Sequence, residues 1–283
     1  MHQSSPPTML PGAAAGRRLL AGLLGLLLLT VSGPAAPAAA DPARIVDATQ
    51  YPFSAIGRVN SAGRNFCTGF LVSSRTLLTA AHCLYDLRQG RWYAPEEVHF
   101  VAGYQRDSWL AHSRAASYTV AEGYDPKRPP DMETAVEDWA VVVLGKPLGE
   151  QVGWLGIDVL DRALQDAFAR GELKATQVGY RRDRAHVQTL RDNCGVPEVF
   201  ADGRGIVHRC DVIELASGSP LLVFREGLTL VLGLHTVRAE ADNGETLAGA
   251  ISSAIFHPKF GLGEASRAAD AAGLDWGGGR RPK

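Results

Sequence analysis

The segment Glu214–Leu222, with the sequence ELASGSPLL, contains a serine that could act as a nucleophile. A serine hydroxyl attacks a carbonyl carbon only when a neighbouring imidazole accepts its proton. The imidazole in turn needs a buried carboxylate, which fixes its tautomer and stabilises its charged form. Taken alone, a serine in S-G-S-P is more often a turn residue. Ser217 is therefore a candidate nucleophile only if the chain also supplies a suitable histidine and aspartate.

A histidine in a distinctive context lies at position 82, within Phe66–Leu84, FCTGFLVSSRTLLTAAHCL. The segment T-A-A-H-C follows a strand-like run, and a cysteine lies 15 residues before the histidine. This pattern resembles the chymotrypsin-fold (trypsin-like) serine peptidases. The resemblance implies that His82 is the general base and that Cys67 and Cys83 form a disulfide that holds its loop.

The carboxylate that such a base requires is found in Glu137–Leu144, EDWAVVVL. The resembled family has an aspartate followed by an aliphatic strand at this place, so the resemblance assigns Asp138 the orientation of His82. Glu137 is the only close alternative. Because neighbouring side chains of an extended segment point to opposite sides, Glu137 would point away from a site that Asp138 faces.

The nucleophile segment is similar to the G-D-S-G-G-P-L pattern of the family, whose bacterial branches often contain S-G-S-P. Ser217, Gly218 and Pro220 match this pattern. The order His82, Asp138, Ser217 along the chain is the order of this fold. The resemblance covers roughly Ile45–Ile255 and implies that Ser217 is the nucleophile.

The residue two positions before the serine departs from the family pattern. There the family uses the backbone N–H groups of the nucleophile and of a glycine as an oxyanion hole, which here correspond to Ser217 and Leu215. A leucine with positive φ is strained by about 1–3 kcal/mol. If the loop relaxes instead, the loss of one donor costs roughly 10²–10³ in rate.

Two functions from different classes therefore remain open. The first is an exported serine endopeptidase that hydrolyses peptide bonds through an acyl-enzyme. The alternative is a catalytically impaired peptidase homologue that acts as a protein-binding module, because a scaffold alone does not prove activity.

Ala216 is a second departure. Trypsin-like enzymes carry an aspartate there, which pairs with a new N-terminal amine made by cleavage before Ile-Val. This chain has Ile45 and Val46 after Arg44, but Ala216 has no charge to receive the amine. Because an unpaired buried amine is costly, we predict no activation by that ion pair.

Two residues give opposite indications of substrate preference. Asp211 lies six residues before Ser217, where an aspartate selects Lys or Arg in trypsin, although bacterial relatives that cut after Glu can carry one too. His235, in V-L-G-L-H-T-V, resembles the histidine with which glutamyl endopeptidases bind a substrate carboxylate. The sequence leaves acidic and basic preference open. Surface or structural roles are predicted for His99, His112, His186, His208 and His257.

The N-terminal segment predicts export. Arg17 and Arg18 precede an apolar run of 13 residues, Leu19–Val31, and a small-residue A-x-A motif ends at Ala40. This is the pattern of a secretory signal peptide comprising residues 1–40. The run is too short to span a bilayer comfortably. A secreted or periplasmic protein without membrane contact after cleavage is expected.

The mature chain keeps all four cysteines, Cys67, Cys83, Cys194 and Cys210. An even number in an exported protein implies two disulfides, with three possible connectivities. The first two and the last two cysteines are each 16 residues apart, which favours one local pair in each half. No C-x-x-C motif supports a metal site, and no cofactor is predicted.

The composition is that of a globular protein, with 46% hydrophobic and 21% charged residues in a chain of 283. A formal net charge of −1 argues against nucleic acid as the main partner, so the predicted partner is a polypeptide substrate. The oligomeric state stays open.

Short β-branched runs separated by turn residues predict an all-β protein, and a helix is plausible only at 158–173. The resemblance implies two six-stranded antiparallel barrels with the active site in the cleft between them. We expect residues 41–155 to form the first barrel, with His82 and Asp138, and residues 156–265 to form the second, with Ser217. A flexible tail is predicted for residues 266–283.

Overall fold

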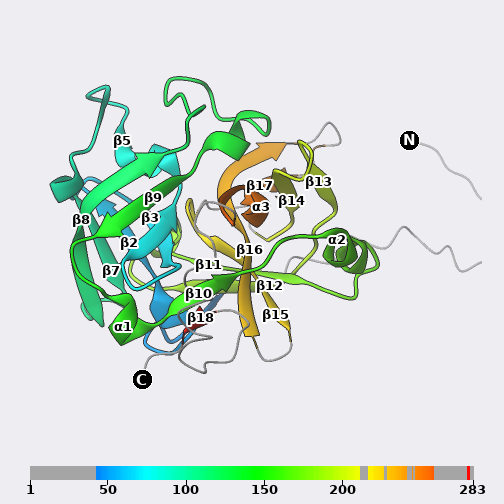
Figure 1. Ribbon diagram of the computed structural model, residues 1–283, viewed down its shortest axis with the longest axis horizontal. Helices are drawn as coiled ribbons and strands as arrows, with labels where there is room; N and C mark the ends of the chain where they lie inside the picture. Colours follow the sequence, from blue (N-terminus) through cyan, green and yellow to red (C-terminus); the bar gives the residue numbers. More distant parts are fainter. Residues whose placement is uncertain are drawn as a thin grey trace, which may run out of the picture. The chain divides into compact units, whose positions relative to one another are not determined.

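The computed structural model describes residues 43–210, 216–225, 228–240, 244, 246–257 and 279–280. These residues belong to one compact unit, Ala40–Lys283, which contains a closed barrel and a larger sheet (Figure 1). The predicted signal peptide lies outside the described residues, as do Asp211 and Leu215. None of the helices in the described part of the chain is long and apolar enough to cross a membrane.

The first half is a closed antiparallel barrel in the strand order β2-β3-β4-β9-β8-β7. Side chains of β7 alternate strictly: Val98, Phe100 and Ala102 are buried inside, whereas His99 and Val101 are less buried. This is the period of two expected for a strand with one face on a core. The strands are β2 (Ile56–Ser61), β3 (Asn65–Leu71), β4 (Thr76–Thr79), β7 (Val98–Ala102), β8 (Ala111–Val120) and β9 (Ala140–Leu144).

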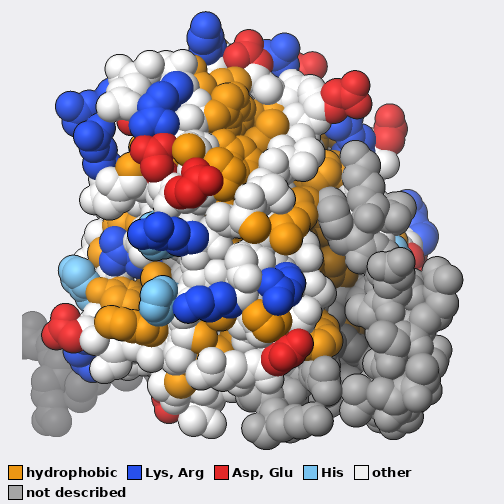
Figure 2. Space-filling model, turned by 60° about the vertical axis from the view of Figure 1, so that its left-hand side comes forward, with side chains coloured by type: hydrophobic (Ala, Val, Ile, Leu, Met, Phe, Trp, Pro, Cys, Tyr) orange, Lys and Arg blue, Asp and Glu red, His pale blue; other side chains and the backbone are white. Residues whose placement is uncertain are grey.

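The outer face of this barrel is rich in histidine and arginine. His99 and Arg114 are cross-strand partners on β7 and β8, and His112 pairs with Val101. Figure 2 shows basic and histidine side chains beside apolar ones on the side of the molecule that carries these strands. His112 and His186 are exposed.

The second half is a sheet in the order β1-β12-β11-β15-β16-β17-β14-β13, and β10 and β18 bring it to ten strands. The all-β class is thus confirmed, but this half is a ten-stranded sheet in which β10 pairs with β16 in parallel, where a six-stranded antiparallel barrel was predicted. Its members are β1 (Arg44–Ile45), β10 (Trp154–Ile157), β11 (Ala175–Gly179), β12 (Thr189–Cys194), β13 (Glu198–Phe200), β14 (Gly205–His208), β15 (Pro220–Arg225), β16 (Leu228–Glu240), β17 (Thr246–Ser252) and β18 (Gly279–Arg280).

A disulfide brings distant strands of this sheet together. Cys194, the last residue of β12, is bonded to Cys210, which lies just after β14. The Arg209 N–H donates to the Gly195 carbonyl at 3.0 Å beside it. The end of β12 and the segment after β14 are therefore adjacent, which curves the sheet toward a barrel.

Helical segments are short. The predicted helix at 158–173 is reduced to α2 (Arg162–Ala169), which Asp161 caps by accepting from the Leu164 N–H. Leu164 and Phe168 are buried, whereas Ala163 is exposed. The other elements are α1 (Gly149–Val152), α3 (Ser253–Phe256), η1 (Phe53–Ala55), η2 (Ala81–Leu84), η3 (Pro95–Glu97), η4 (Thr134–Glu137), η5 (Arg182–Arg184), and the hairpin of β5 (Tyr85–Asp86) and β6 (Arg91–Trp92).

The chain ends contribute to the second sheet. β1 pairs with β12 although it precedes the first barrel. Within the predicted flexible tail, Gly279 and Arg280 pair antiparallel with β10, and the rest of the tail lies outside the described residues. Both ends of the described chain therefore add strands to this half.

Thr68 on β3 makes three hydrogen bonds, of which two join the first barrel to the second half and one lies within the first barrel. Its N–H donates to the Ser217 carbonyl at 2.8 Å, and its hydroxyl oxygen accepts from the Tyr180 N–H at 2.9 Å. Its carbonyl accepts from the Thr79 hydroxyl at 2.7 Å. Because Thr68 is fully buried, each of these groups would be costly to leave unpaired.

Gly218 lies against the same place. Its φ is +80°, and a Cβ there would lie 2.1 Å from the Thr68 carbonyl oxygen and 2.6 Å from the Thr79 hydroxyl. Such distances are far below van der Waals contact. The position therefore needs glycine both for its backbone conformation and for the close approach of the two halves.

We predict that Gly218→Ala lowers the free energy of unfolding by about 4 kcal/mol or more. Gly203 is the matched control, because its φ is +86° but a Cβ there would have no atom within 4 Å. Gly203→Ala should cost only about 1–2 kcal/mol, for the left-handed backbone alone. Urea titration of both variants measures the difference, and equal losses would contradict the crowding at Gly218.

Candidate active site

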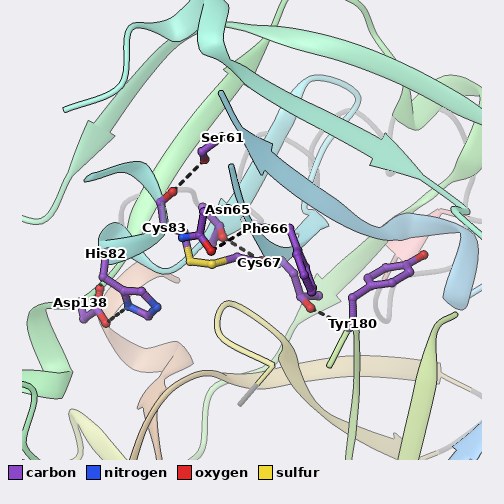
Figure 3. The surroundings of a disulfide bond; sticks show 10 residues. Ser61, Asn65, Phe66, Cys67, His82, Cys83, Asp138 and Tyr180 are labelled. Atoms are coloured by element: carbon purple, nitrogen blue, oxygen red, sulfur yellow. Dashed lines mark hydrogen bonds and ion pairs between the residues drawn. A yellow bond between two sulfur atoms is a disulfide. The ribbon is translucent and has the colours of Figure 1, made fainter. Parts of the chain in front are cut away.

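The position of His82 is fixed by the strand before it and by the disulfide of the residue after it. It lies in η2, directly after β4, and Cys83 beside it is bonded to Cys67 of β3. The Ser61 hydroxyl donates to the Cys83 carbonyl at 2.8 Å. Figure 3 shows this disulfide next to the histidine. The pairing is the one expected from the sequence, and it ties the histidine loop to the barrel wall.

Asp138 makes two hydrogen bonds to His82. Its Oδ2 atom lies 2.5 Å from the ring Nδ1 atom, and its Oδ1 atom accepts from the His82 backbone N–H at 2.8 Å (Figure 3). Asp138 is only 7% exposed and is the residue between η4 and Trp139. The carboxylate thus fixes both the backbone and the ring, and it holds the proton on Nδ1 so that Nε2 can accept another.

The pKa of His82 is raised by its surroundings. Burial lowers it, as does the nearby Arg182, but the charge and hydrogen bond of Asp138 raise it by more. The net direction is upward because an opposite charge in contact favours the protonated ring. The same carboxylate would stabilise the imidazolium formed during proton transfer.

Ser217 is in a tight turn before β15. The Ser219 N–H donates to the Ala216 carbonyl at 2.9 Å, and the Gly218 N–H donates to the His235 carbonyl at 2.8 Å. His82, Asp138 and Ser217 all line one cleft of about 740 Å³. The structure therefore brings the three sequence-predicted residues to the same cavity, although they are far apart in the chain.

The Ser217 hydroxyl and the His82 ring form no hydrogen bond in the described part of the chain. Such bonds are often long without substrate and shorten in the reacting complex. The second predicted oxyanion donor, Leu215, lies outside the described residues. Only the Ser217 half of that predicted pair can therefore be placed.

Ile45 does not occupy a buried activation site. It is 48% exposed and pairs in β1 with Thr189, and Arg44 before it forms an ion pair with Asp192. Ala216 is buried. The predicted absence of an amine–carboxylate pair concerns a chain cleaved after Arg44, and it stays a prediction.

His235 lies on β16 beside the serine turn. Its N–H donates to the Ser219 carbonyl at 2.9 Å, and its ring Nδ1 atom is 3.1 Å from Nε2 of His208. Both histidines are fully buried. Sequence reasoning did not assign His208 to the site, because only the register of β14, β17 and β16 places it against His235.

The hydrogen bonds of His208 and His235 determine which ring nitrogen of each carries the proton. The Cys210 N–H can only donate, so His208 Nδ1 must accept at 3.3 Å. Burial, with a further contribution from His235, lowers the pKa of His208 well below its usual value, so this ring is neutral with its proton on Nε2. His208 then donates to His235 Nδ1, which leaves the His235 proton on Nε2. His235 is thereby a hydrogen-bond donor through Nε2.

The cleft walls also carry charged side chains, among which the sequence singled out only Glu137 and Asp138. Four cationic side chains line it, together with the carboxylates of Asp125, Glu137 and Asp138; the cations are Lys127, Arg128, Arg182 and Arg238. Glu137 lies 3.9 Å from Arg204. The balance in the cleft is therefore slightly basic.

Cys67, His82 and Cys83 are close enough to suggest a metal site among the described residues. The two sulfur atoms are bonded to each other, so neither is a thiolate ligand. The cluster therefore has no more than one available ligand atom.

The family model described as "Trypsin" matches residues 44–192, which is more than half of the chain. The chain therefore belongs to the trypsin family, a family of serine peptidases with the chymotrypsin-like fold. Its family assignment agrees with the strand arrangement and with the position of His82 and Asp138 within the matched region.

The sequence identity to individual similar proteins is low, at 20–27%. A glutamyl endopeptidase of Bacillus licheniformis is 27% identical over 117 residues, which is 41% of this chain and 34% of that protein. A cercarial protease of Schistosoma mansoni is 27% identical over 181 residues, 62% of each chain. The matches thus span about a third and somewhat under two thirds of these relatives. A solved Glu endopeptidase structure in complex with MPD superposes with a TM-score of 0.61 at 20% identity, covering 80% of this chain and 97% of that one.

We predict that Asp138→Asn moves the pKa of His82 from above to below its ordinary value of about 6.5. The substitution removes the charge that raises the pKa, and the burial that lowers it remains. NMR titration of the His82 ring protons measures the shift. The matched control is Glu137→Gln, since Glu137 lines the same cleft but does not contact the ring. A similar shift in both variants would contradict the assignment of Asp138.

Proposed function

We propose that this protein is an exported serine endopeptidase in which Ser217 is the nucleophile, His82 the general base and Asp138 the orienting carboxylate. The observation that carries this proposal is the pair of hydrogen bonds that Asp138 accepts from His82 in the cleft that Ser217 also lines. Membership of the trypsin family supports it.

In this mechanism the Ser217 Oγ atom attacks the carbonyl carbon of the scissile peptide, and its proton passes to Nε2 of His82. The oxyanion accepts a hydrogen bond from the Ser217 N–H and, as proposed, from the Leu215 N–H. His82 then protonates the leaving amine, the C–N bond breaks, and an ester to Ser217 remains. Water attacks the ester by the same proton transfers in reverse and releases the carboxylic acid.

The raised pKa of His82 determines how the rate depends on pH. The ring must be neutral to accept the serine proton, so the rate falls as the pH is lowered through the pKa of His82. Because this pKa is raised, activity should require a pH above about 6.5. In Asp138→Asn, the fall of the rate at acidic pH should move to lower pH. The maximal rate should also drop, by about 10⁴, as it does when the aspartate of another Ser-His-Asp triad is replaced by asparagine.

The test is covalent labelling of the mature protein by a fluorophosphonate probe. We predict labelling of the wild type, with a rate that rises with pH through the His82 pKa, and none in Ser217→Ala. Ser219→Ala is the control, because Ser219 is a serine of the same turn that is fully buried. A folded wild type without label would contradict the enzyme and favour the protein-binding alternative.

Export is part of the proposal. The predicted signal peptide, residues 1–40, motivates it, and the two disulfides are consistent with an oxidising compartment. We expect a secreted or periplasmic protein that acts on polypeptides.

We further propose a preference for acidic residues on the N-terminal side of the scissile bond. The hydrogen-bond chain from Cys210 through His208 makes His235 Nε2 a donor, and the backbone of His235 contacts the serine turn. The His235 ring is buried, and the next residues, Thr236, Val237 and Arg238, line the cleft. The names of two of the similar proteins, glutamyl endopeptidase and Glu endopeptidase, support this preference over a basic one.

We predict faster cleavage after Glu than after Lys in matched peptides. His235→Leu should lower kcat/KM for the Glu peptide by about 10–100-fold, as expected for the loss of one hydrogen bond to a charged group, while fluorophosphonate labelling persists. His112→Leu, at an exposed position on the barrel, is the control. Faster cleavage after Lys or Arg would contradict the preference and favour the specificity role of Asp211.

A further inference from the structure

A small pocket lies behind the serine turn, between the facing residues of β11 and β12. Its volume is about 10 Å³, and it is lined by Ala43, Gln177, Gly179, Arg181, Thr189, Arg191 and Ala216. This is room for about one atom of the size of water. No aspartate or glutamate is among these described lining residues. The pocket is separate from the cleft that holds His82.

The chemically distinctive group in the pocket is the guanidinium of Arg191. Arg191 is opposite Gln177 in the β11–β12 register and is only 8% exposed. Its Nε atom is buried and has no hydrogen-bond partner within the described ranges. An arginine is always protonated, so an uncompensated positive charge is buried here.

The neighbouring carboxylates do not neutralise Arg191. Asp183 is engaged by Arg181 through two hydrogen bonds of 3.0 and 3.1 Å. Asp192 is engaged by Arg44 at 3.1 Å. Once these pairs are counted, the described groups at the pocket leave one positive charge. That charge would also repel an N-terminal ammonium group, which is a second physical reason for predicting no activation ion pair next to Ala216.

We propose that this pocket is a binding site for an anion, with Arg191 as its principal donor. Its size fits a single halide ion or one oxygen atom of a carboxylate. The anion would satisfy the Arg191 Nε–H and remove the cost of a buried unpaired charge. Two sources share this chemistry: chloride from solution, and the carboxylate of Asp41, which lies two residues before Ala43 in the sequence.

The site is in contact with the serine turn. Ala216 lines the pocket and is followed directly by Ser217. Gly179, another lining residue, is so close that a Cβ there would lie 2.9 Å from Cβ of Ser219 and 3.3 Å from Cβ of Ala216. Occupancy of the pocket therefore stabilises the backbone that presents the nucleophile.

The first experiment measures the Tm of the mature protein, starting at Asp41, as chloride replaces gluconate at constant ionic strength. If chloride is the occupant, Tm should rise in a saturable manner, by about 3–6 °C at tenfold excess over Kd. Arg191→Gln should abolish the rise. Arg170→Gln, which breaks an exposed ion pair with Glu172, should leave it intact.

The Asp41→Asn variant distinguishes the two sources. A chloride response that appears only in Asp41→Asn would show that the carboxylate of Asp41 occupies the site in the wild type. A response in both forms would show that the anion comes from solution. No response in either form would overturn the proposal.

A bromide soak of wild-type crystals keeps the test independent of how well Arg191→Gln folds. An anomalous peak within hydrogen-bond distance of Arg191 in the wild type or Asp41→Asn supports the site, and its absence from both overturns it. The rate of fluorophosphonate labelling should rise as the anion fills the pocket, and this measurement rests on the proposed function. A Tm response without any labelling would count against the enzyme and leave the anion site standing.

Discussion

The contact between Thr68 and the serine turn is the constraint on which the site depends. The first barrel contains His82 and Asp138, and the second half contains Ser217, so the proton transfer of the proposed mechanism requires that the two halves keep one relative position. Thr68 bonds to Ser217, Tyr180 and Thr79 with buried groups. Gly218 lets the turn approach the Thr68 carbonyl to a distance that no side chain would allow. The neighbour of Thr68 is Cys67, whose disulfide holds the histidine loop.

Electrostatics then decides the properties of each buried group. Asp138 is placed where it outweighs the effect of burial on His82 and raises its pKa. His208, without a carboxylate, has its pKa lowered by burial and remains a neutral link in a hydrogen-bond chain. The buried Nε–H of Arg191 has no partner among the described residues, and we propose that an anion accepts its hydrogen bond. Burial thus affects His82, His208 and Arg191 differently, because the fold gives each of these side chains a different partner.

Local motifs were enough to predict much of the site. The resemblance to the trypsin-like peptidases implied His82, its neighbouring disulfide and Asp138. The motifs that carry this resemblance, T-A-A-H-C and an aspartate before an aliphatic strand, are each contained in a few consecutive residues. Equal spacing favoured, among three possible connectivities, the two local disulfides that the structure contains. The all-β class follows from short β-branched runs, although these runs could not reveal that β1 and β18 extend the second sheet.

The groups that sequence reasoning missed depend on long-range register. His208 meets His235 only across β14, β17 and β16, and Arg191 faces a pocket only through its pairing with Gln177. Thr68 is one of many threonines in strands until the serine turn is placed against it. The effect of Leu215 on the oxyanion site is likewise a question of backbone direction, which residue identity alone does not determine.

The central claim is that Thr68 and Gly218 hold Ser217 where His82 can activate it. The most direct measurement is a crystal structure of the mature protein after treatment with a phosphonate that mimics the tetrahedral intermediate. The account predicts a bond from Ser217 Oγ to phosphorus, His82 Nε2 within hydrogen-bond distance of Oγ, and a phosphonate oxygen on the Ser217 N–H. An unmodified Ser217 in a folded protein with the His82–Asp138 pair intact would contradict it.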